Sequence, residues 1–105
     1  MDFKQIFEQI FESKSLRLFW EQANRYIDQA GGMNTGIISM LTDEELSIAR
    51  QYLLHRLKKE AEWLLHCAEK PLISLVKDSG EKVKRIAELL YTIFIEEEIR
   101  KERKR

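Results

Sequence analysis

Apolar residues recur along this chain with the period of an α-helix. In the first dozen positions they are spaced i, i+3, i+4, i+7 and i+8, which places Phe3, Ile6, Phe7, Ile10 and Phe11 on one stripe. Asp2 and Gln5 have the spacing of a capping box, in which each side chain bonds the backbone amide of the other residue. We therefore predict a first helix that begins after Asp2.

A second helix is predicted to follow after a break at residues 13–15. The next apolar set points away from the first stripe on a helical wheel, and it consists of Leu16, Phe19, Trp20, Ala23, Ile27 and Ala30. One straight helix would then be apolar on two faces, so Ser13 or Ser15 is expected to cap a new helix. Gly31 and Gly32 are expected to end it through a left-handed glycine cap.

The clearest helix start lies at Thr42. Glu45 follows three residues later and completes a capping box, and Leu41 and Leu46 have the spacing of a hydrophobic staple. This helix is predicted to run over residues 43–69. Pro71 is expected to stop it, because proline excludes its predecessor from the helical region.

Two further helices are predicted after Pro71. Residues 71–77 fit a short helix with Pro71 at its first position. Asp78 or Ser79 is then expected to cap a last helix that runs from about residue 80 into the tail. The main stripe of this last helix consists of Val83, Ile86, Leu90 and Phe94, but its apolar surface covers more than half of the circumference.

These elements predict an all-α fold: a small, elongated bundle of four to five helices with a long antiparallel helical hairpin. Residues 1–105 are expected to form a single domain, with residues 96–105 as a solvated, charged helix end. Each long helix would measure about 40 Å. The apolar surplus predicts contact with a partner protein, and the interface candidates are Phe3, Phe7, Phe11, Phe19, Trp20, Leu89, Ile93 and Ile95.

Composition narrows the class of protein. The chain is 44% hydrophobic and 34% charged, which excludes disorder for most of its length, and 18 basic residues balance 18 acidic ones. High charge with little Gly, Pro and Cys is typical of proteins from hot habitats. The longest apolar stretch, residues 86–95, is too short to cross a bilayer. We therefore expect a cytoplasmic protein that makes no membrane contact.

Arg50 and His55 form the one pattern with a catalytic precedent. Their R-x4-H spacing resembles the R-x4-6-H motif of the HEPN ribonucleases, a family of small all-helical bundles that dimerise. The resemblance implies that Arg50 and His55 would act together on RNA at a dimer interface. Gln51 is a loose fit to the polar residue that this family often has after its arginine. Arg50 also falls in an apolar stripe, so it needs an acidic partner; Glu45 and Glu60 are candidates.

Other chemistry has little support in the sequence. His55 and His66 fall on the polar face about three turns apart, too far to share a metal ion. Cys67 is expected to be a buried, inert residue. We therefore predict no metal site, no cofactor and no small-molecule substrate.

The C-terminal tail offers a possible nucleic-acid contact. Its basic residues are Arg100, Lys101, Arg103, Lys104 and Arg105, which would bind phosphates without sequence preference. Alternatively, they form a solvated helix end in which Glu96 pairs with Arg100 and Glu97 with Lys101.

The leading functional hypothesis is a non-enzymatic interaction or adaptor subunit. It would oligomerise or dock on a larger assembly through apolar faces, mainly of its first, second and last helices. A nucleic-acid-associated subunit and a HEPN-like ribonuclease are the alternatives.

Overall fold

A computed structural model describes residues 2–104, which form five α-helices and no strand. The helices are α1 (Phe3–Glu12), α2 (Lys14–Gln29), α3 (Gly36–Met40), α4 (Asp43–Glu69) and α5 (Ile73–Arg103). The molecule measures 49 × 27 × 24 Å. The prediction of a small, elongated all-α bundle of four to five helices is confirmed, although the fifth helix is α3 and not the separate helix predicted over residues 71–77.

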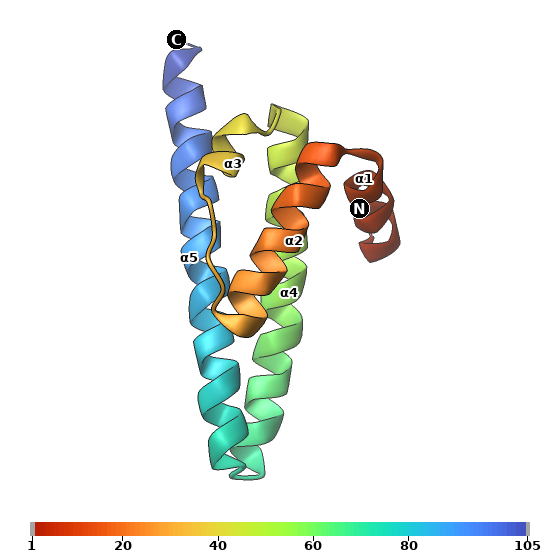
Figure 1. Ribbon diagram of the computed structural model, residues 1–105. Coiled ribbons are helices and arrows are strands. Elements are labelled where there is room, and N and C mark those ends of the chain that lie inside the picture. The colour runs from red at the N-terminus through yellow and green to blue at the C-terminus, as the bar shows by residue number, and fades with distance from the viewer. Residues whose placement is uncertain (1, 105) are drawn as a thin grey trace.

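An antiparallel hairpin of α4 and α5 forms the body of the molecule. These helices contain 27 and 31 residues, and their mutual contact is the most extensive between any two elements. The shorter α1, α2 and α3 lie along only the upper part of the hairpin (Figure 1). Below them, α4 and α5 continue as a bare pair of helices down to the turn that joins them.

The helix starts follow the predicted capping residues. Asp2 and Gln5 form a capping box at α1, and Thr42 and Glu45 form one at α4. Ser13 separates α1 from α2 and caps α2 by accepting a hydrogen bond from the Leu16 amide at 3.1 Å. Helix α4 has the predicted bounds, residues 43–69. These starts depend on neighbours within three residues, which the sequence displays directly.

The predicted glycine cap at the end of α2 is wrong. Ala30, rather than a glycine, adopts the left-handed conformation, with φ of 52°. The Ala30 amide donates to the Tyr26 carbonyl and the Gly31 amide to the Arg25 carbonyl. A Cβ atom at Gly31 would lie 2.8 Å from Cγ of Arg25, so Gly31 serves the close approach to that side chain.

The predicted break at residues 78–80 is also wrong. Residues 73–103 form one helix, and Pro71 lies in the turn before it instead of at the first position of a separate helix. Ser79 is 1% exposed, and its hydroxyl donates to a carboxylate oxygen of Glu60 on α4 at 2.8 Å. The serine that could have capped a helix therefore bonds across the hairpin, which allows α5 to continue.

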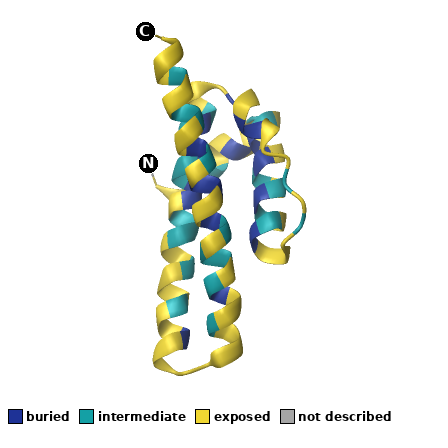
Figure 2. Ribbon diagram, turned by 90° about the vertical axis from the view of Figure 1, so that its left-hand side faces the viewer, coloured by how far each residue is buried: buried dark blue, intermediate teal, exposed yellow. Residues whose placement is uncertain are grey.

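The core occupies the upper part of the hairpin. Its buried residues come from all five helices and from Leu41 before α4. In residues 54–85, all of which the structure describes, only Cys67 and Ser79 are buried. Figure 2 shows this gradient as a change from blue and teal in the upper hairpin to mainly yellow below. The lower hairpin thus has almost no core of its own.

This burial corrects the predicted interface. Phe19, Leu89 and Ile93 are at most 2% exposed and belong to the core, so they are not available to a partner. Phe3, Phe11 and Ile95 are exposed, whereas Phe7 and Trp20 are half-buried. The helical wheel identified apolar positions correctly, but it did not show which of them the chain itself would cover.

Replacement of Thr42 by alanine should lower the free energy of unfolding by about 1 kcal/mol, because it removes the hydroxyl that accepts from the Glu45 amide. Chemical denaturation measures the change. Thr35→Ala is the matched control, since Thr35 precedes α3 and makes no side-chain cap bond. Equal losses in the two variants would contradict a specific role for the capping box.

Candidate interaction surface

Arg50 and His55 do not form a joint site. Five residues along a helix turn the chain through about 140° beyond a full turn, so the two side chains leave α4 in different directions. Arg50 points towards α5 and His55 towards α1, where each has its own partner. Within one chain, Arg50 and His55 therefore do not converge on a common point; the HEPN resemblance places their joint action at a dimer interface.

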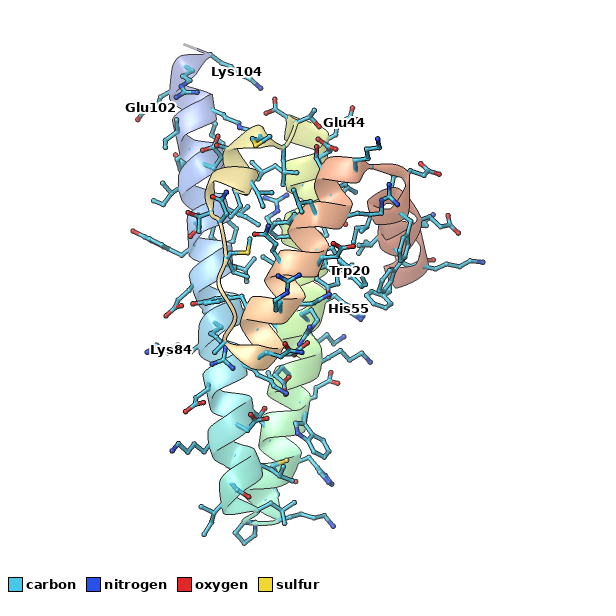
Figure 3. The ribbon with its side chains drawn as sticks, viewed as in Figure 1. Trp20, Glu44, His55, Lys84, Glu102 and Lys104 are labelled. Atoms are coloured by element: carbon cyan, nitrogen blue, oxygen red, sulfur yellow. The ribbon has the colours of Figure 1, made fainter. Side chains whose placement is uncertain are left out.

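His55 is covered by the aromatic cluster of α1. Its ring stacks on Phe3 with centroids 3.9 Å apart and an interplanar angle of 15°. Phe7 is in edge contact with Phe3 and contacts Trp20 on α2. Figure 3 shows His55 and Trp20 on the α1 side of α4, away from α5. The expectation that His55 lies on an open polar face is wrong, because the N-terminal helix folds over it.

The acidic partner of Arg50 is Glu97. The guanidinium Nη1 lies 3.0 Å from the Glu97 carboxylate, across the hairpin from α4 to α5. Neither predicted candidate is the partner: Glu45 accepts a hydrogen bond from Ser13, and Glu60 accepts one from Ser79. The ion pair is partly exposed and joins the upper ends of the two long helices.

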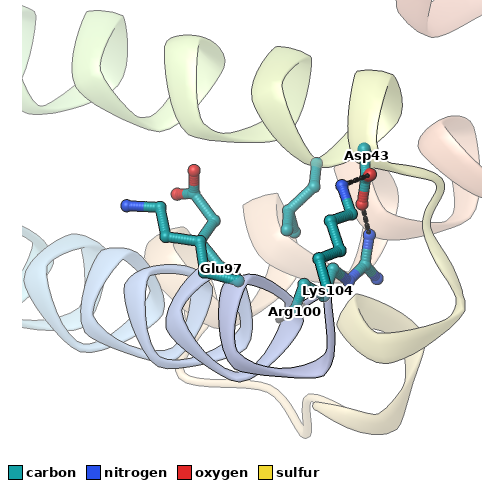
Figure 4. A pocket seen from close by; sticks show the side chains of 6 residues that line it. Asp43, Glu97, Arg100 and Lys104 are labelled. Atoms are coloured by element: carbon teal, nitrogen blue, oxygen red, sulfur yellow. Dashed lines mark hydrogen bonds and ion pairs between the residues drawn. The ribbon is translucent and has the colours of Figure 1, made fainter.

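A shallow pocket of about 180 Å³ at the upper end of the hairpin is lined by three basic residues of the tail, Arg100, Lys101 and Lys104, together with Asp43, Leu46 and Glu97 (Figure 4). Asp43 accepts from Arg100 at 2.9 Å and from Lys104 at 2.8 Å. These two bonds, the one from Lys104 first, lower the pKa of the Asp43 carboxyl. Arg100 also donates to Glu96 and to the Leu41 carbonyl. The positive charges of Arg100 and Lys104 are therefore engaged by groups of the chain itself.

The five predicted phosphate contacts differ in their surroundings. Arg100 and Lys104 pair with Asp43, and Lys101 pairs with Glu98 at 3.2 Å. Arg103 is exposed and has no ion pair among residues 2–104, while Arg105 lies outside the described residues. The predicted pair of Glu96 with Arg100 is confirmed, whereas Glu97 pairs with Arg50 instead of Lys101. These contacts resemble a charged helix end more than a phosphate-binding surface.

An uncovered apolar surface runs along the hairpin. We call it the hairpin face, and none of its residues is buried: on α4 they are Leu54, Leu57, Ala61, Leu64, Leu65 and Ala68, and on α5 Val76, Val83, Ala87, Tyr91 and Phe94. Leu65 is 61% exposed and Tyr91 is 67% exposed. Such a continuous apolar surface is unusual on a protein that stays alone in water.

The hairpin face lies on the side of the hairpin away from α2 and α3. Helix α4 contacts α2 through Arg56, which bonds Asp28 at 2.8 Å, and α5 contacts α2 through Arg85, which donates to the Ile27 carbonyl. On a helical wheel these contacts lie roughly 150° from the centre of the hairpin face. Helices α2 and α3 therefore cover one side of the hairpin, and the hairpin face is the other side.

The hairpin face also has a signal in the sequence. On α4 its positions 54, 57, 61, 64 and 68 alternate steps of three and four residues. On α5 the face residues Val76, Val83, Ala87 and Phe94 fit the same pattern, whose remaining positions are Gly80 and the buried Leu90. This heptad spacing is typical of helices that pack in bundles. It runs beside the stripe that each helix uses inside the hairpin, so the two stripes merge into one wide apolar surface.

Other classes of site find no support among residues 2–104. No three metal-ligating His, Cys, Asp or Glu side chains lie together in that range. None of the described helices has an apolar stretch of the length needed to cross a membrane. Cys67 is fully buried, as predicted.

Comparison with known proteins adds no identification. No protein-family model matches this chain, and the comparisons with curated proteins and with solved structures found no match either.

The contact of His55 with Phe3 predicts a pH dependence. Burial, helped by the positive charges of Lys59 and Lys58, lowers the pKa of His55. The unfolded chain therefore takes up this proton at a higher pH than the folded chain, and the free energy of unfolding falls as the pH drops below about 6.5. Thermal unfolding between about pH 8 and pH 5.5 measures the fall.

His55→Phe keeps an aromatic ring at this position and removes the titration, so it should reduce the fall in stability. The same substitution at the exposed His66 is the control. An unchanged pH dependence in His55→Phe would refute the assignment.

Proposed function

We propose that this chain is a non-enzymatic helical interaction subunit that binds protein through its hairpin face. One observation carries the proposal: in residues 54–85 the long hairpin leaves apolar side chains of both helices uncovered while burying only Cys67 and Ser79. Two helices cannot exclude water from such a surface by themselves. A partner on the hairpin face would bury it.

The electrostatic arrangement supports the same proposal. The polar residues next to the hairpin face are charged and exposed, among them Lys58, Glu62, Lys77 and Lys84. An apolar centre with a charged rim is the usual composition of a protein–protein interface. The separation of Arg50 from His55 gives a ribonuclease activity no geometric support, and the ion pairs of Asp43 give none to phosphate binding by Arg100 and Lys104.

A double substitution on the hairpin face tests the proposal. Ala61 and Ala87 are exposed helical residues at its centre, so Ala61→Glu with Ala87→Glu should leave the monomer fold intact. We expect the purified wild-type chain to bind a protein partner, itself or another, and the double variant to lose most of that binding because two carboxylates would be buried.

The control is Ser74→Glu, which introduces one such carboxylate at an exposed position of α5 outside the hairpin face. Affinity capture followed by mass spectrometry, together with light scattering for self-association, measures the binding. Equal binding by the wild type and the double variant would exclude the hairpin face as the interaction surface.

A further inference from the structure

We infer that the occupant of the hairpin face is the hairpin face of a second copy of this chain. The two copies would be related by a two-fold axis parallel to the long helices. The turn between α4 and α5, which we call the tip of the hairpin, would then lie at the same end in both copies. Helix α4 of one copy then lies against α5 of the other, and the four long helices form an antiparallel bundle. This inference rests on the proposed function and names the partner.

The spacing of the apolar positions supports a helical hairpin as the occupant. Alternating steps of three and four residues place apolar side chains where two helices pack side by side at a shallow angle. Helix α4 has this spacing on the hairpin face, and Val76, Val83, Ala87 and Phe94 of α5 fall on the same pattern, so the surface fits two parallel rows of side chains from two further helices. A second copy supplies two such helices with the same spacing, and four helices are the usual number around one apolar core.

The charges along the two outer edges of the hairpin face favour one arrangement of the two copies. The outer edge of each long helix is the side next to the hairpin face that is turned away from the other long helix. The outer edge of α4 carries Lys58, Glu62 and Glu69, and that of α5 carries Lys77, Lys84 and Glu88; all six residues are exposed. Figure 3 shows Lys84 pointing from α5 away from α4, as an outer-edge position requires. With the axis parallel to the hairpin, the outer edge of α4 in one copy meets the outer edge of α5 in the other.

A single antiparallel register of these two edges aligns opposite charges throughout. Glu69 then lies opposite Lys77 of the second copy, Glu62 opposite Lys84, and Lys58 opposite Glu88. Glu88 also accepts a hydrogen bond from Tyr26 in its own chain. The Glu69–Lys77 and Glu62–Lys84 pairs therefore contribute more to the affinity of the dimer than the Lys58–Glu88 pair does. This register is within one residue of the one that the Arg50–Glu97 pair defines in the upper hairpin, and seven residues from the one that the Ser79–Glu60 hydrogen bond defines lower down.

The opposite arrangement, with the tips at opposite ends, has poorer electrostatics. In that arrangement α4 meets α4 and α5 meets α5. When the midpoints of the two lower hairpins are level, Lys77 of each copy lies opposite Lys84 of the other. This contact occurs twice by symmetry and is repulsive both times. Like charges across an interface are unfavourable, so the arrangement with the tips together is preferred.

Sedimentation of the full chain tests self-association. We expect a concentration-dependent species of twice the 12.5 kDa chain mass. Ala61→Glu with Ala87→Glu should raise the dimer dissociation constant roughly a hundredfold or more, and Ser74→Glu should leave it unchanged. A wild type that stays monomeric up to about 1 mM would overturn the inference. So would a double variant that still dimerises.

Charge reversal tests the arrangement and does not insert charge into the apolar centre. Glu62→Lys and Lys84→Glu should each raise the dissociation constant about tenfold, because each replaces two attractive pairs of the symmetric dimer with two repulsive ones. The double variant restores opposite charges and should recover most of the wild-type affinity. Additive losses in the double variant would refute the contact between Glu62 and Lys84 of the second copy.

The two proposals fail in different ways. A monomeric chain that captures another protein, and loses it in the Ala61→Glu and Ala87→Glu variant, would overturn the second copy as occupant but keep the interaction function. A monomeric chain with no captured partner would overturn both. Circular dichroism of each variant verifies that α4 and α5 remain helical.

Discussion

Each of two long helices in contact shields only one face of the other from water, and the arrangement of the whole molecule follows from that limit. Each helix of the α4–α5 hairpin carries apolar residues over a wide part of its circumference, so each needs a second covering surface. Helices α1, α2 and α3 supply that surface for the upper part of the hairpin and on one side only. The position of the core, the thin lower hairpin and the uncovered hairpin face all follow from this partial cover.

Polar side chains add directed hydrogen bonds to the apolar packing that holds the short helices on the hairpin. Arg56 reaches Asn24 and Asp28 on α2, Arg85 donates twice to the Ile27 carbonyl, and Arg100 donates to the Leu41 carbonyl before α4. Arginine suits this role because its planar group donates several bonds in fixed directions while its aliphatic stem packs on apolar neighbours. Many of the charges in this chain therefore act as internal connections between helices.

The parts of the fold that could be predicted from the sequence depend on residues close together in the chain. The caps at Asp2, Ser13 and Thr42 are of this kind, because the cap and the amide that it satisfies are three residues apart. Ser79 has the same residue type but bonds Glu60, nineteen residues away, so local reasoning misread it as a cap. A longer separation along the chain, 47 residues, hid Glu97 as the partner of Arg50. For the candidate site, the periodicity of the sequence showed that α4 and α5 carry more apolar residues than one hairpin can bury. It did not show which of these residues α2 and α3 would cover and which would stay exposed.

The single cysteine gives the lower hairpin a built-in reporter of local opening. Cys67 is fully buried in the part of the molecule with the fewest other buried residues, so its thiol reacts with reagents in water only when the two helices separate there. The reaction rate consequently measures the free energy of separating the tip without unfolding the upper core. If a second molecule lies on this segment, that free energy rises with protein concentration, and the local stability of one hairpin becomes a property of the assembly.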